Sequence, residues 1–185
     1  VFLFVLLVLV GFLGNPDPIY NLAPTFIWVI WWVGVAYVSA FLGDVWALLN
    51  PWQITFGWVE ILWRWLNSGK SLLPIMQYPE KAGVWPALFV FLVFAWVENV
   101  YSDSIIPARI SQMILVYSVF TWLGMILFGK DVWIRHGETF SLAFRLFAKF
   151  APTEVRPIDH KFTVDTGRTF DAGLLERSDE SRIVK

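Results

Sequence analysis

The segment from Phe26 to Leu42 restricts the fold of this chain more than any other, because it contains no charged side chain. Its sequence, FIWVIWWVGVAYVSAFL, is apolar on every face of a helix, so such a helix cannot lie on the surface of a soluble protein. Its length is close to the roughly 20 residues that cross the hydrocarbon core of a bilayer. The segment therefore predicts a transmembrane helix over residues 25 to 43.

The composition extends this prediction to the whole chain. Of the 185 residues, 57% are hydrophobic and 16% are charged, whereas soluble domains carry about 25% charged residues. The 12 Trp residues suit the headgroup boundary, where an apolar ring can also hydrogen-bond. A net charge of -1 provides no general attraction to nucleic acid, and the lack of cysteine excludes iron–sulfur clusters and thiolate zinc sites. We expect a Trp-rich integral membrane protein whose surroundings are lipids and other membrane subunits.

Three more apolar segments are predicted to span the bilayer, at residues 1 to 13, 84 to 101 and 108 to 128. The first is too short to cross the membrane alone at 1.5 Å per residue. We therefore interpret Val1 as the middle of a helix whose beginning is missing, as in a fragment or a processed chain. The fold class predicted is all-α and integral to the membrane, with about four transmembrane helices.

Two amphipathic segments are predicted to lie along the membrane surface. In residues 45 to 66, Asn50-Pro51 and five Trp residues interrupt the apolar pattern, and Glu60 and Arg64 are spaced to form an ion pair on one helix face. A fifth, broken transmembrane helix is the alternative for this segment. Residues 131 to 150 place Trp133 and three Phe residues on one face, which predicts a single surface-lying helix.

The chain becomes polar after Pro152, which divides it into a transmembrane domain at 1–152 and a polar tail at 153–185 that we expect to be extended or irregular. The predicted topology places residues 44 to 83 and 129 to 185 on one side of the membrane. Thirteen of the 14 Lys and Arg residues lie in these two segments. Basic residues accumulate on the cytoplasmic side, so the C-terminus is predicted to be cytoplasmic.

Few residues are candidates for chemistry. Glu98 is an acidic residue within an apolar helix and is a candidate for proton transfer or ligand binding, although an ion pair with Arg109 at the interface is the simpler interpretation. His136 and Glu138 provide a possible base and carboxylate, but they are two residues apart and diverge on a helix. Asp44 and Asn50 are more typical of helix caps.

The same residues argue against several cofactors. A metal site needs three or four converging ligands, and the second of the two histidines, His160, lies in the tail, so no metal site is predicted. No histidine lies inside a predicted span, which also argues against a bis-histidine haem. The chain has no GxSxG, HExxH or glycine-rich phosphate-binding motif.

Four segments together resemble the fenitrothion-hydrolase-type family of bacterial multi-spanning membrane proteins. They are GNPDPIYNLAPTFIWVIWWVG, LGDVWALLNPW, YPEKAGVWPALFVFLVFAWVENVYSD and FGKDVWIRHGETFSLAFRLFAKFAP, and the resemblance covers about residues 10 to 152. The resemblance implies a multi-spanning helical architecture in the inner membrane of a bacterium and, by the family name, hydrolysis of an organophosphorus ester. It assigns no catalytic residues. It also implies further helices after the FAP segment, so we interpret the chain as truncated or as completed by a partner subunit.

Three functions follow as hypotheses. The first is a structural or accessory subunit of a larger membrane complex. The second is a membrane-bound organophosphorus hydrolase in which Glu98, His136 or Glu138 polarises water or an ester. The third, a component of a transporter with a polar path past Glu98, is the least favoured because one buried carboxylate makes a poor path.

Overall fold

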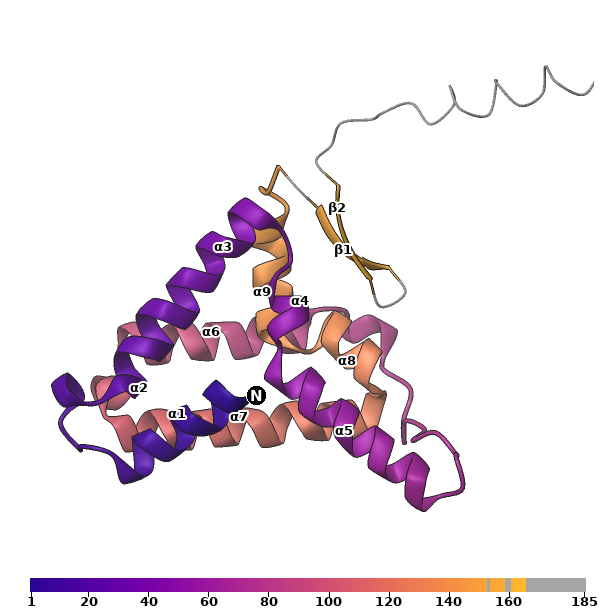
Figure 1. Ribbon diagram of the computed structural model, residues 1–185, viewed down its shortest axis with the longest axis horizontal. Helices are drawn as coiled ribbons and strands as arrows, with labels where there is room; N and C mark the ends of the chain where they lie inside the picture. Colours follow the sequence, from indigo (N-terminus) through magenta and orange to yellow (C-terminus); the bar gives the residue numbers. More distant parts are fainter. Residues whose placement is uncertain (153, 159–160, 166–185) are drawn as a thin grey trace, which may run out of the picture.

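The computed structural model describes residues 1–152, 154–158 and 161–165, and these residues are mainly helical. The helical elements in chain order are α1 (Phe2–Leu13), η1 (Pro18–Tyr20), α2 (Leu22–Thr25), η2 (Phe26–Gly34), α3 (Val35–Leu42), α4 (Trp46–Leu49), α5 (Pro51–Leu66), η3 (Glu80–Ala82), α6 (Trp85–Asn99), η4 (Ser102–Ile105), α7 (Pro107–Phe128), α8 (Lys130–His136) and α9 (Thr139–Ala148). Figure 1 shows the long helices as sides of an open, roughly triangular frame.

Three helices in the described part of the chain are long and apolar enough to cross a membrane: Leu22–Leu42, Glu80–Asn99 and Pro107–Phe128. They correspond to three of the four predicted spans. The fourth, at residues 1 to 13, forms α1, which has only 12 residues and would extend about 18 Å. The first of the three long helices is continuous through α2, η2 and α3, and its η2 section is wound as a π-helix.

Helix α7 is the element against which the N-terminal helix packs. Gly11 of α1 lies so close to α7 that an added Cβ would be 2.0 Å from Ser111 Oγ. The Ser111 hydroxyl donates to the carbonyl of Val8 at 3.1 Å, which ties the two backbones together. Farther from this contact, the Phe4 ring meets Trp52 with 5.7 Å between centroids. Helix α1 therefore runs antiparallel to the first half of α7.

The chain reverses at Gly129, which has a φ of 87° that favours glycine, and α8 then runs back along α7. Trp133 of α8 packs onto Gly124, and its ring is stacked on Phe128 at 5.8 Å. The predicted single surface helix over residues 131 to 150 is therefore wrong. Two helices, α8 and α9, meet at Gly137 and Glu138, because the apolar face of this segment finds a partner in α7.

Helix α9 contributes Phe140 and Phe144 to the aromatic core. It contacts α3, α4, α6 and α8, and in Figure 1 it descends from the end of α3 toward α4. Phe140 lies 4.6 Å from Trp31 and 5.0 Å from Phe94 of α6, measured between ring centroids. Phe144, which is completely buried, meets Trp31 and Trp32, each at 5.8 Å. Helices from distant parts of the sequence are thus joined through α9.

Helix α5 has a buried first half and an exposed second half. Trp52 and Phe56 belong to the core, as does Trp46 of α4, which corrects the prediction that these Trp residues lie at the membrane surface. The second half exposes Trp58, Trp63 and Trp65. Glu60 pairs with Lys130 of α8 and not with Arg64 as predicted, because α8 returns beside α5.

The polar tail begins with an antiparallel hairpin of β1 (Glu154–Ile158) and β2 (Lys161–Asp165), in which Glu154 pairs with Asp165 and Ile158 with Lys161. These ten residues are extended, which is one of the two forms expected for the tail, and four of them are β-branched, which favours strands. Pro157 is tolerated because a two-stranded sheet has only edge strands. The rest of the predicted tail, including His160, lies outside the described residues.

A substitution at Gly124 tests the packing of α8 on α7. An added Cβ would lie 2.2 Å from Trp133 Cε2, so Gly124→Ala should lower the free energy of unfolding by about 1–3 kcal/mol through overpacking. The measurement is the thermal unfolding midpoint in detergent micelles, followed by circular dichroism.

Gly57→Ala in α5 is the matched control, because nothing lies within 4 Å of its added Cβ. Alanine is favoured over glycine in a helix by about 1 kcal/mol, so the control should keep or raise the midpoint. Equal midpoints for the two variants would contradict the close packing of Trp133 on Gly124.

Candidate functional site

Glu138 is a completely buried carboxylate at the start of α9. Its Oε1 accepts hydrogen bonds from the Tyr117 hydroxyl and, at 3.0 Å, from the backbone N–H of Phe140. Its Oε2 accepts from the backbone N–H of Ser141 at 2.7 Å and from the Asn50 side chain at 3.2 Å. The carboxylate thus caps α9 and links it to α7 and to the start of α5. We call Glu138, Asn50, Tyr117 and Ser141 the Glu138 node.

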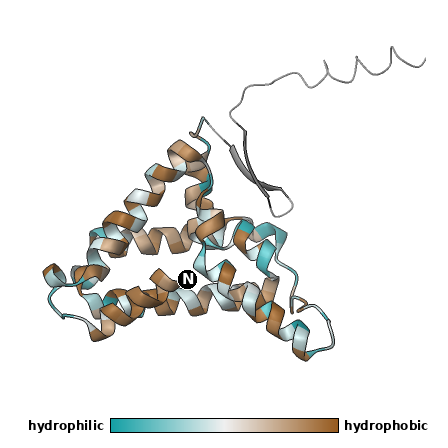
Figure 2. Cartoon of the chain, viewed as in Figure 1, coloured by the Kyte–Doolittle hydropathy of each residue, from teal (hydrophilic) through white to brown (hydrophobic). Residues whose placement is uncertain are grey.

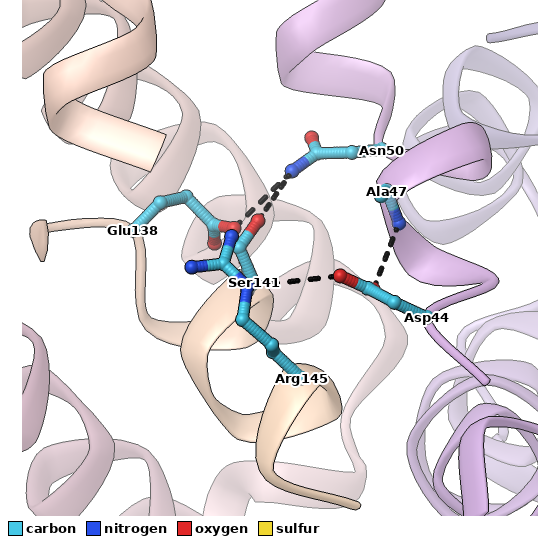
Figure 3. Close-up of polar contacts among 6 residues, drawn as sticks. All are labelled: Asp44, Ala47, Asn50, Glu138, Ser141 and Arg145. Carbon is cyan, nitrogen blue, oxygen red and sulfur yellow. Dashed lines mark hydrogen bonds and ion pairs between the residues drawn. The ribbon is translucent and has the colours of Figure 1, made fainter. Parts of the chain in front are cut away.

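Asn50 connects the starts of two helices within this node, as Figure 3 shows. Its Oδ1 caps α5 by accepting from the backbone N–H groups of Trp52 at 3.0 Å and Gln53 at 3.2 Å. Its Nδ2 points the other way and donates to Glu138 and, at 3.2 Å, to Ser141 Oγ. The local reason is the Asn50-Pro51 pair, because Asn is a preferred cap and proline is accepted in the first turn. The predicted capping role of Asn50 is confirmed.

The Glu138 node lies opposite the middle of α7. Tyr117 and its neighbour Ser118 are close to the midpoint of the 22 residues of this helix. Ser118 accepts a hydrogen bond from Trp52 Nε1 at 2.8 Å, which fixes α5 at the same level. Thr139, next to Glu138, donates to the carbonyl of Ala87 in α6 at 3.2 Å. Elements α5, α6, α7 and α9 therefore share polar contacts at one level of the structure.

Asp44 provides a second, more exposed polar contact with α9. Its carboxylate accepts from the backbone N–H of Ala47 at 3.2 Å and lies 3.7 Å from Arg145 Nε (Figure 3). The predicted capping role of Asp44 is therefore confirmed. The Arg145 side chain is 40% exposed, so this ion pair contributes little stability compared with the buried Glu138 node.

The arrangement of the Glu138 node stabilises an ionised carboxylate. An ionised carboxylate has about four lone-pair sites, and here two donors serve each oxygen. The positive end of the α9 dipole adds to this stabilisation. Because every acceptor site is occupied, Glu138 has no free lone pair with which to take a proton from a substrate. In the described residues, no group of three or more His, Asp or Glu side chains is placed to hold a metal ion.

The structure separates the three candidate residues from one another. Glu138 is in the core, whereas His136 points away from it, with its ring stacked on Tyr78 at 5.5 Å. The divergence of His136 and Glu138 is therefore confirmed. Glu98 is partly exposed near the end of α6, and Arg109 bonds to Gln112 at 3.0 Å, so the suggested pair of Glu98 with Arg109 is wrong.

Sequence reasoning missed Tyr117 and Ser141 as partners of Glu138. Tyr117 lies within an apolar span, where one hydroxyl gives no local pattern. Glu138 was recognised as a candidate carboxylate but not as a helix cap, because Asp, Asn, Ser and Thr are the usual caps. The useful signal was Gly137, which interrupts the amphipathic pattern directly before Glu138.

Comparisons with models of known protein families, with curated proteins and with solved structures found no match to this chain.

Replacing Glu138 with glutamine tests the Glu138 node. In Glu138→Gln, an NH2 group, which can only donate, replaces one carboxylate oxygen and faces hydrogen-bond donors. The variant should therefore lower the free energy of unfolding by at least about 2 kcal/mol, the contribution of one hydrogen bond to a charged group. The readout is the thermal unfolding midpoint in detergent micelles.

Glu98→Gln serves as the control, because Glu98 lies in the apolar helix α6 but is partly exposed and does not belong to the Glu138 node. Its midpoint should stay at the wild-type value. An unchanged midpoint in Glu138→Gln would show that the buried carboxylate does not hold these helices together.

Proposed function

We propose that this chain is a membrane-embedded structural subunit that presents apolar helix faces to other subunits of a membrane complex. The observation that carries this proposal is the low burial of two of the three candidate spans. In the most apolar stretches of Leu22–Leu42 and Glu80–Asn99, 6% of the residues are buried, against 33% in Pro107–Phe128.

The packing of the two little-buried helices supports the proposal. Helix α6 packs mainly on α9 and meets η2 of the first span through Phe91 and Phe94, and α3 also packs on α9. Figure 2 shows hydrophobic colour along both helices. Exposed large residues on them include Val29, Tyr37 and Phe41 on one and Phe89, Leu92 and Trp96 on the other. A bundle of membrane helices normally packs along its length, and these faces are available for additional helices.

The Glu138 node suits a structural role better than hydrolysis. A scaffold needs its helices fixed, and a carboxylate with four donors fixes α5, α7 and α9. A general base needs a free lone pair within reach of the proton that it takes, and Glu138 has none. Glu98 and His136 lie apart from Glu138, so the three residues form no common site.

Native co-purification tests the structural-subunit proposal. The chain is isolated from its own membrane in a mild detergent, and the preparation is analysed by native mass spectrometry. We expect one or more membrane proteins in fixed stoichiometry with the chain. Recovery of a stable, monodisperse chain that carries only lipid would overturn the proposal, because lipid alone would then cover the exposed faces.

A double substitution distinguishes a specific contact on α6 from non-specific hydrophobic association. Phe89→Ala combined with Leu92→Ala shortens two exposed side chains of α6. The matched control shortens Val116 and Val119, which are exposed on α7. Loss of the partner only with the α6 variant would assign that face to the complex.

We also propose that the chain lies in a bacterial inner membrane with its C-terminal side in the cytoplasm. With three spans, residues 43–79 and the chain after Gly129 fall on one side and hold 12 of the 14 basic residues. The loop at residues 100–106 falls on the other side and contains Asp103 and no basic residue. Such a distribution follows the excess of Lys and Arg in cytoplasmic segments.

Cysteine labelling tests this orientation, because the chain has no cysteine of its own. Ser102→Cys and Ser68→Cys form a matched pair at exposed positions on opposite sides of the proposed membrane. In intact spheroplasts, a membrane-impermeant maleimide should label Ser102→Cys, and it should label Ser68→Cys only after the membrane is opened. The reverse pattern would invert the topology.

A further inference from the structure

A pocket of about 480 Å³ lies at the end of α7, away from the Glu138 node. It is open on one side and is lined by the loop at residues 74–83, by Phe128 at the end of α7, and by Val132 and His136 of α8. The backbone N–H of Met76 donates to the carbonyl of Leu127 at 2.8 Å, which ties the loop to α7. The volume is in the range of sites that bind small molecules, about 300–1,000 Å³.

Aromatic contacts hold the walls of this pocket in place. The Tyr78 ring is stacked on His136 and meets the edge of Phe128 with 5.2 Å between centroids. The Tyr78 hydroxyl donates to the carbonyl of Gly83 at 2.8 Å, which closes the loop. Burial raises the pKa of Tyr78 above its usual value, so the hydroxyl remains a neutral donor in this bond. The pocket is therefore formed without a ligand.

The polar side chains that line the pocket include two acceptors, on His136 and Glu80, and the amide of Gln77, which offers both a donor group and an acceptor. His136 Nδ1 lies 3.1 Å from the carbonyl of Val132, which can only accept, so the neutral ring carries its proton on Nδ1. Nε2 is then an acceptor. Glu80 adds a negatively charged carboxylate to the lining. The other walls, which include Met76 and Phe128, are apolar and suited to contact with an aromatic ring.

We propose that this pocket binds a small aromatic molecule that carries an amino or hydroxyl donor. The ring packs against the apolar wall, and its donor group bonds to His136 Nε2 or to the Glu80 carboxylate. A cationic amine is favoured over an anion of the same size because of the charge of Glu80. The proposal concerns a ligand site and is independent of the structural role proposed above.

Tyramine is a suitable probe, because it has an aromatic ring with a hydroxyl group and an ammonium group, and it is soluble outside detergent micelles. The chain contains two histidines, so the imidazole NMR signals of labelled protein report His136, with His160 as an internal reference. Assignment uses the His160→Gln variant. We expect a saturable shift of the His136 signal with a Kd of about 1 mM, as for a small ligand in an open pocket.

Two comparisons make the test specific. 4-Hydroxyphenylacetate, an anion of similar size, should bind at least tenfold more weakly than tyramine. Val132→Trp fills the pocket and should abolish the shift, whereas Val116→Trp, at an exposed position on α7, should leave it unchanged. A His136 signal that does not saturate, or that shifts equally in Val132→Trp, would overturn the proposal.

Discussion

The buried carboxylate of Glu138 is the constraint on which the arrangement of α5, α7 and α9 depends. A charge in an apolar interior is costly unless hydrogen bonds replace its hydration. Four donors from three helices make that replacement, and none of these four donors is a cation. Because two of the donors are Tyr117 of α7 and Asn50 at the start of α5, α9 cannot shift along these neighbours without removing hydrogen bonds from the carboxylate. The carboxylate therefore fixes the position of α9 as well as its start.

The position of α9 then determines how the other long helices are held. Its aromatic residues join η2 to α6, and the π-helical winding of η2 lets adjacent Trp31 and Trp32 both contact Phe140 and Phe144. In an α-helix, adjacent side chains point 100° apart, so two consecutive Trp residues share one face less easily. The frame is thus built around a ten-residue helix, and the long helices extend from it with most of their surface free.

The sequence predicted the long apolar helices well, because their signal is local: an uncharged run of sufficient length has few alternatives. It predicted the caps at Asp44 and Asn50 for the same reason. It failed for residues 131 to 150, since a helix with one apolar face gives the same pattern whether that face meets lipid or α7. The Glu138 node was also beyond sequence reasoning, because Tyr117 and Asn50 are brought to Glu138 only by the reversal at Gly129.

The reversal of the chain at Gly129 has a consequence for biosynthesis. Asn50 is separated from Glu138 by 88 residues, which take about 4–18 s to translate at 5–20 residues per second. Throughout this interval, Asn50 lacks its acidic partner, so its amide must remain hydrated or bond to another group. The interior of this protein is therefore completed last, from the C-terminal side, after its longest apolar helices have already been made.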